Sequence, residues 1–162
     1  MEQLTLFPHL YKYIIDTCSL LDQKDSRKYN RTIHKTLWSN IEQLIKNKEV
    51  VVCSEISNEI QKDDTLGDYL SLNQCEVLDA SERVQEKVVD IVNKIPALLN
   101  FKKGTGKSSG DAFLIATAIV YGLTIITEEK QGVAGRIPDI ASKFGIEVVN
   151  INGLCEKENW VF

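Results

Sequence analysis

Acidic side chains stand where predicted strands end or predicted helices begin, and carboxylates gathered at one place bind divalent cations. The candidates are Asp16, Glu59, Asp111 and Glu129, with Glu128 as an alternative to Glu129. Two carboxylates about 4 Å apart repel by about 4 kcal/mol at an effective dielectric constant near 20, so several of them stay ionised together only beside a cation. The histidines and cysteines lack the spacing of zinc ligands, and oxygen ligands favour Mg²⁺ or Mn²⁺.

Alternating strands and helices must position these acids. Buried runs of β-branched and aromatic residues predict strands, and apolar residues three or four apart predict helices. Strands are expected within 11–21 and at 50–53, 75–78, 123–127 and 146–149; helices are expected at 31–48, after Ser54 as N-cap, after Ser81 as N-cap up to Pro96, at 111–122 and from Ile137 to Gly145. The pattern predicts an α/β fold: a three-layer α/β/α sandwich, doubly wound around a parallel sheet of four to five strands, in a single domain spanning residues 1–162.

In this fold the carboxyl ends of the strands meet at one edge, where open α/β sheets bind ligands. Asp16 follows the first strand, Glu59 lies early in the helix after the second, Asp111 opens the helix before the fourth and Glu129 follows the fourth. Each acid alone also fits a turn or a helix cap. One shared cation site explains all four positions better than four separate caps.

Composition limits the class of protein. The 162 residues are 43% hydrophobic and 26% charged, as in soluble globular proteins, and no apolar run approaches the roughly 18 residues of a membrane span. The four cysteines show no paired spacing, and the N-terminus has no signal-peptide pattern, so a reducing cytoplasm is expected. The formal net charge of −4 argues against non-specific gripping of nucleic acid, although local basic clusters remain.

Two such basic clusters flank the acids. Lys102, Lys103 and Lys107 precede Asp111 in a glycine-rich loop, and Lys130 and Arg136 follow the fourth acid. Both clusters are candidates to meet substrate phosphates, or else are solvated loops.

These residues resemble the PIN-domain nucleases, which include the VapC-type toxins of toxin–antitoxin modules. The resemblance covers most of the chain, and Ile137-Pro138-Asp139 with Gly145-Ile146 is similar to a functionally undescribed PIN subgroup. It is carried by Ile15-Asp16-Thr17-Cys18-Ser19, Glu59, Gly110-Asp111-Ala112 with Ile115-Ala116 and Ala118, and Ile126-Thr127-Glu128-Glu129.

The resemblance implies hydrolysis of RNA phosphodiester bonds with Mg²⁺ or Mn²⁺ as cofactor. The catalytic and metal-binding roles would fall on Asp16, Glu59, Asp111 and Glu129, with Thr17, Ser19, Thr127 and Glu128 in support. The family more often has Asp at the fourth position, which leaves open whether Glu129 contacts the metal directly or Glu128 substitutes for it. The resemblance also leaves open whether the site binds one metal ion or two.

The function predicted is therefore a metal-dependent endoribonuclease that acts as the toxin of a toxin–antitoxin module, with RNA as substrate. An antitoxin protein and a second copy of the chain are expected partners, and a membrane is not. The alternative is a catalytically inactive PIN scaffold that binds RNA or protein. A phosphoacceptor receiver domain and a haloacid-dehalogenase phosphatase are excluded, because the first strand is not followed by the paired acids that they require.

Overall fold

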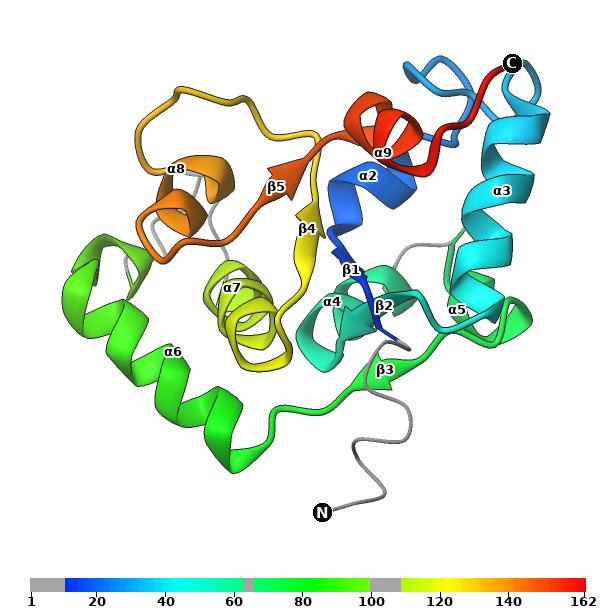
Figure 1. Ribbon diagram of the computed structural model, residues 1–162. Coiled ribbons are helices and arrows are strands. Elements are labelled where there is room, and N and C mark those ends of the chain that lie inside the picture. The colour runs from blue at the N-terminus through cyan, green and yellow to red at the C-terminus, as the bar shows by residue number, and fades with distance from the viewer. Residues whose placement is uncertain (1–10, 63–65, 100–108) are drawn as a thin grey trace.

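A parallel sheet lies at the centre of the structure, a computed structural model that describes residues 11–62, 66–99 and 109–162 (Figure 1). Its strands are β1 (Tyr13–Ile15), β2 (Val50–Cys53), β3 (Val77–Leu78), β4 (Thr124–Ile126) and β5 (Val148–Val149), in the order β3-β2-β1-β4-β5. All neighbouring strands are parallel, and Ile14 of β1 lies opposite Val51 of β2 and Ile125 of β4. The predicted sheet is confirmed.

The central strands form because their residues suit a sheet that is covered on both faces. Every residue of β1 and β2 is buried, and the β-branched side chains of Val and Ile pack well on a pleated surface. The outer strands β3 and β5 are short and partly exposed, as expected at the edges of a sheet.

Helices flank the sheet, as predicted for this fold (Figure 1). They are α2 (Thr17–Leu21), α3 (Lys35–Lys46), α4 (Ser54–Gln61), α5 (Tyr69–Leu72), α6 (Glu82–Lys94), the 3₁₀ turn η1 (Pro96–Leu99), α7 (Ser109–Tyr121), α8 (Ile137–Ser142) and α9 (Ile151–Glu158). Helix α7 packs against β1, β2 and β4, and α4, α6 and α8 pack against α7. The central position of α7 explains why the sequence of this helix is apolar nearly all round.

The helix expected at 31–48 begins later than predicted, at Lys35. The side chain of Asn30 accepts a hydrogen bond from the backbone N–H of Thr32 at 2.8 Å, and this local turn competes with a helical start. Ile33, which falls inside the predicted range, therefore lies before the helix and is 75% exposed.

One further prediction of a helix end is corrected by the structure, and one helix was not predicted. Cys53, in an extended conformation, is the N-cap of α4, and Ser54 is its first helical residue. The tail from residue 151 was not predicted to be helical, yet α9 forms there because the side chain of Asn150 accepts from the N–H of Gly153 at 2.7 Å. Ser81, by contrast, caps α6 as predicted.

No helix in the described part of the chain combines the length and apolar character needed to cross a lipid bilayer.

Candidate active site

The order of the strands places the candidate site between β1 and β4. The chain passes from β1 to β2 on one side, and it returns from β3 to β4 on the other side of β1. Crevices at such a switch point, beyond the carboxyl ends of the strands, are where open α/β sheets bind ligands. Asp16 and the pair Glu128-Glu129 follow β1 and β4, so both lie at this switch point.

Asp16 is held rigidly at the end of β1. It is 6% exposed, it is the N-cap of α2, and its backbone N–H donates to the carbonyl of Ile126 at 2.9 Å. Its Oδ1 accepts from the N–H of Thr17 at 2.8 Å, and its Oδ2 accepts from the Thr127 hydroxyl and the Cys18 thiol, each at 3.0 Å. The carboxylate is therefore buried, ordered and fully engaged by donors.

Burial raises the pKa of the Asp16 carboxyl above its ordinary value, and the negative charge of Glu129 raises it further. The hydrogen bonds from Cys18, Thr127 and the Thr17 backbone oppose this rise. An ionised Asp16 is thus costly beside Glu129, and a nearby cation would relieve the cost.

Glu59 is connected to Asp16 through Thr17. The Thr17 hydroxyl donates to Oε2 of Glu59 at 2.9 Å, while the backbone N–H of the same residue donates to Asp16. Helix α4, which carries Glu59, starts directly at the end of β2 and packs against α2. The two carboxylates predicted to share a site are therefore bridged by one residue.

Asp111 lies half-buried in the first turn of α7. A two-residue turn joins the end of α7 to β4, so the start of the helix lies toward the carboxyl ends of the strands. Helix α7 also packs against β1 and α4, which carry the residues before Asp16 and around Glu59. The fold thus brings Asp111 to the predicted edge of the sheet.

Glu128 and Glu129 face different parts of this edge. Glu129 adds to the negative charge felt by Asp16, and its Oε1 accepts from the N–H of Ile137 at the start of α8 at 3.1 Å. Glu128 accepts from the N–H of Ile151 at the start of α9 at 2.7 Å, and burial raises its pKa. Each glutamate stabilises a helix N-terminus, and Glu129 is the one electrostatically linked to Asp16.

A hydroxyl group without a partner lies close to Asp16 in the sequence. Ser19 is fully buried, and its Oγ has no hydrogen-bond partner in the described structure. Buried polar groups are rarely left unpaired, so this hydroxyl has capacity for a further ligand. Within residues 11–62, 66–99 and 109–162, however, no three His, Cys, Asp or Glu side chains are arranged to hold a metal ion.

Cys18 was not among the predicted site residues, although it stands next to Thr17. Its Sγ lies 3.0 Å from Oδ2 of Asp16 and 3.3 Å from the hydroxyl of Thr127. Burial, with the nearby charge of Asp16, raises the pKa of the Cys18 thiol to about 12, so the thiol stays protonated and donates. Only its place two residues after Asp16 hinted at this interaction.

A cleft of about 520 Å³ opens beside Glu128 and Glu129, and its lining does not include Asp16, Glu59 or Asp111. Glu128 and Glu129 form part of its lining, and Asp22, Ser26, Arg27, Lys28, Lys130, Gln131 and Asn150 complete it. The segment after Asp16 thus forms one wall of the cleft. Arg27 and Lys28 were not predicted as site residues, because their run of mixed charge shows no period.

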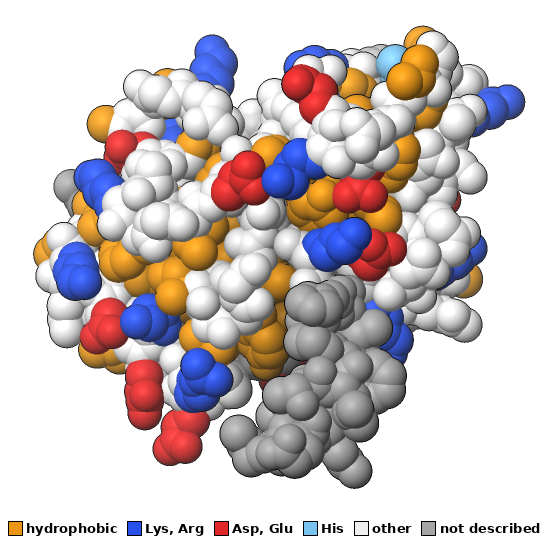
Figure 2. Space-filling model, in the orientation of Figure 1, with side chains coloured by type: hydrophobic (Ala, Val, Ile, Leu, Met, Phe, Trp, Pro, Cys, Tyr) orange, Lys and Arg blue, Asp and Glu red, His pale blue; other side chains and the backbone are white. Residues whose placement is uncertain are grey.

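Basic residues reach this cleft only in part as predicted. Lys130 lines it, whereas Arg136 is exposed at the N-cap of α8 and is not part of the lining. Lys102, Lys103 and Lys107 lie outside the described residues. Acidic and basic side chains are interspersed over the face in Figure 2, so positive charge is local rather than a continuous surface.

The family model described as Domain of unknown function (DUF4411) matches residues 13–162. No curated protein matches the sequence significantly.

Solved structures share the fold at low identity. The FitAB complex bound to an IR36 DNA fragment has a TM-score of 0.55 and 16% identity, over 86% of this chain and 94% of that one. DNA-bound VapBC from Salmonella typhimurium has a TM-score of 0.51 and 18% identity, over 87% of this chain and 98% of that one. VapBC2 from Rickettsia felis, bound to a fragment of its promoter DNA, has a TM-score of 0.51 and 16% identity, over 85% of this chain and 97% of that one. The resemblance to PIN-domain proteins is confirmed at the level of the fold.

Proposed function

The chain belongs to the family described as Domain of unknown function (DUF4411), and on that premise we propose that this PIN-like protein is a metal-dependent endoribonuclease. The observation that carries the proposal is Asp16. A carboxylate buried at the switch point, linked through Thr17 to Glu59 and exposed to the charge of Glu129, is expensive for a purely structural role.

The donor chemistry at this edge suits Mg²⁺ or Mn²⁺. Asp16, Glu59, Asp111 and Glu129 would hold the ion through carboxylate oxygens, and the unpaired hydroxyl of Ser19 is available to support it. When bound, the ion supplies activation of water and neutralisation of charge at phosphorus.

The residues of the chain itself would orient the site and the substrate. Thr17 donates to Asp16 and to Glu59, and Thr127 donates to Asp16, so these two residues would hold both carboxylates in fixed orientations. Arg27, Lys28 and Lys130 line the neighbouring cleft and would bind backbone phosphates that the acids alone repel. Lys102, Lys103, Lys107 and Arg136 remain further candidates for binding phosphates.

The biological role proposed is that of a toxin in a toxin–antitoxin module in the cytoplasm. The support is the shared fold with the FitAB and VapBC complexes. An antitoxin protein and a second copy of the chain are the proposed partners, in one PIN-like domain that spans residues 1–162.

The test is cleavage of single-stranded RNA by the purified chain in EDTA and after addition of Mg²⁺ or Mn²⁺. The wild type should cut only with metal, and Asp16→Asn should not cut. Asp79→Asn is the matched control, because Asp79 also follows a strand at this edge but is exposed beside the outer strand β3. Metal-independent cutting, or equal loss in both variants, would refute the assignment.

The second candidate is the inactive scaffold that binds RNA or protein. It is favoured by the absence, among the described residues, of three acids already arranged for a metal, and by the structural use of Glu128 and Glu129 at helix starts. Metal-dependent RNA binding by the wild type with no cleavage under any condition would select this candidate.

A further inference from the structure

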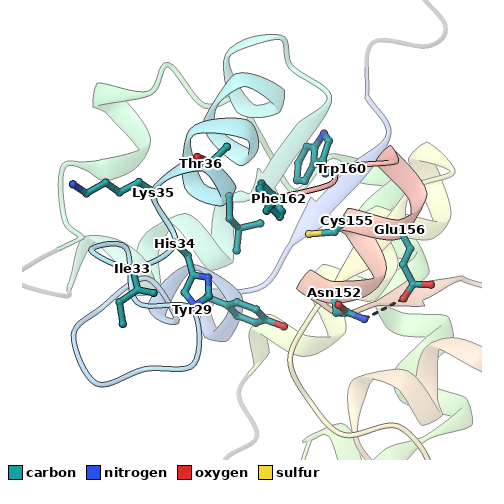
Figure 3. A pocket seen from close by; sticks show the side chains of 11 residues that line it. Tyr29, Ile33, His34, Lys35, Thr36, Asn152, Cys155, Glu156, Trp160 and Phe162 are labelled. Carbon is teal, nitrogen blue, oxygen red and sulfur yellow. Dashed lines mark hydrogen bonds between the residues drawn. The ribbon is translucent and has the colours of Figure 1, made fainter.

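A second cavity, of about 530 Å³, lies between the turn that precedes α3 and the C-terminal part of the chain. Figure 3 shows Tyr29 and His34 on one side of it, with Cys155, Asn152 and the end of the chain on the other. Its volume is in the range of small-molecule binding pockets. None of the four predicted catalytic acids belongs to its lining.

The linings of the cavity and of the cleft beside Glu128 and Glu129 take neighbouring residues from the same two segments of the chain. In the first segment Lys28 lines the cleft and Tyr29 lines the cavity. In the second segment Asn150 lines the cleft and Asn152 lines the cavity. The Nζ of Lys28 lies 5.2 Å from the centre of the Tyr29 ring. A ligand that places a phosphate on Lys28 can therefore place an attached group in the cavity.

Four of the residues that line the cavity carry rings, namely Tyr29, His34, Trp160 and Phe162. The rings of Tyr29 and His34 pack edge to face, with 5.7 Å between the ring centres, and this contact restricts the orientation of both rings. Trp160 is partly buried against the core, and Phe162 is 68% exposed. Rings held at the edge of a nucleic-acid site are the surfaces on which unpaired bases stack.

Polar groups in the same cavity favour a base over the apolar face of a partner helix. The side-chain amide of Asn152 donates to Oε1 of Glu156 at 3.1 Å, and both side chains line the cavity. An apolar helix would bury this amide and this carboxylate and would offer them no hydrogen bond beyond the one that they share, which is costly. A base carries donors at its edge, and a carboxylate accepts from exocyclic amino groups such as N4 of cytosine.

We propose that this cavity, defined by Tyr29, His34, Asn152, Glu156, Trp160 and Phe162, is a base-binding subsite for an unpaired nucleotide next to the cleaved bond. The inference rests on the proposed ribonuclease function, because it takes the neighbouring cleft as the path of the RNA backbone. The carboxylate of Glu156 selects bases with an amino group, namely cytosine, adenine or guanine, over uracil.

The first test measures binding of short single-stranded RNA to the full chain in an Asp16→Asn background, which prevents cleavage. Phe162→Leu keeps an apolar side chain but removes the ring, and it should weaken binding by roughly 5- to 150-fold, the range for one stacked base. Val161→Leu is the matched control, because Val161 is adjacent, 92% exposed and outside the lining. Its affinity should equal that of the background.

Fluorescence reports the stacking directly. The chain has two tryptophans, and Trp38 is fully buried, so a change in emission on adding RNA comes from Trp160. The emission of a single 2-aminopurine in the RNA should change on binding when that base occupies the cavity, and Phe162→Leu should remove this change. Glu156→Gln should abolish the preference for oligo(C) over oligo(U) without removing binding.

The outcomes separate the subsite from the nuclease. If the wild type cuts RNA but Phe162→Leu and Glu156→Gln bind and cut like the control, the subsite is refuted and the nuclease stands. If the wild type never cuts but RNA binding depends on these residues, the subsite stands and the nuclease fails. If the variants weaken only assembly with a partner protein, the cavity is a protein-docking site and the proposal is overturned.

Discussion

Replacing Asp16 by Asn should make the stability of the protein independent of divalent cations. The substitution keeps the shape of the side chain, and its remaining Oδ1 still accepts from the N–H of Thr17. The new amide can donate toward the hydroxyl of Thr127 and the Sγ of Cys18, which now accept instead of donating. The metal-free variant should therefore unfold within about 1 kcal/mol of the wild type.

The sign of the pH dependence follows from the raised pKa of Asp16. The folded chain holds the Asp16 proton more tightly than the unfolded chain, because burial disfavours the charged form. This contribution to the stability of the metal-free protein is fully present below the pKa of the unfolded chain, and it is lost as the pH rises through the folded pKa. The Asp16→Asn variant should lack this component.

A cation that replaces the proton should restore the lost stability near neutral pH. At 100 times its dissociation constant, a ligand that binds only the folded state stabilises it by about 2.7 kcal/mol. For a chain of this size each kcal/mol shifts the melting temperature by about 2–4 °C, so the expected shift is about 5–10 °C.

Thermal unfolding followed by circular dichroism measures these effects. Wild type, Asp16→Asn and Asp79→Asn should be melted in EDTA and with Mn²⁺ or Mg²⁺, from acid to neutral pH. The wild type and Asp79→Asn should respond to metal increasingly as the pH rises. A wild-type melt unmoved by either metal, or an equal shift in Asp16→Asn, would refute the cation site.

Three other perturbations test the remaining parts of the site. Asp111→Asn should abolish RNA cleavage without loss of the fold in circular dichroism, since the amide preserves shape; cleavage at the wild-type rate would leave Asp111 as a structural residue. Glu129→Gln should keep the hydrogen bond from the N–H of Ile137, so the melting temperature of the metal-free protein should stay within a few degrees of the wild type. It should lower the cleavage rate at least tenfold, because the charge beside Asp16 is gone. An unchanged rate would contradict the role of Glu129. Replacing Lys28 and Lys130 by Gln should reduce the slope of log affinity against log salt by about 0.7 for each of the two lysines that binds a phosphate of single-stranded RNA, and parallel salt titrations for variant and wild type would show that the cleft does not bind the backbone.

The sequence by itself determined the sheet and the positions of the acids along it. Runs such as Tyr13–Ile15 and Val50–Cys53 are buried because consecutive apolar residues cannot form a strand with one wet face. A charged residue that ends such a run must lie where the strand emerges, so Asp16 was placed at the sheet edge by local pattern alone. The helix expected after Ser54 forms as α4, with Ile56 and Ile60 buried on one face.

Tertiary structure alone decided which groups meet. The hydroxyl of Thr127 reaches Asp16 across 111 residues of chain, and that of Thr17 reaches Glu59 across 42, because parallel strands bring distant segments to one edge. The choice between Glu128 and Glu129 was open in the sequence, since adjacent residues share every local signal. The structure shows only where each side chain goes: Glu129 reaches the start of α8 and Glu128 the start of α9, which depends on how these helices dock.

The aromatic cavity shows the same limit of the sequence. Tyr29 and Phe162 belong to segments without a period, and Ile33, inside the predicted helix range 31–48, lies before the helix and is exposed. These residues meet because the C-terminal residues after α9 return to the start of α3 (Figure 1). Local periodicity reports which face of an element is buried, but only the packing of the whole chain fixes which exposed side chains become neighbours.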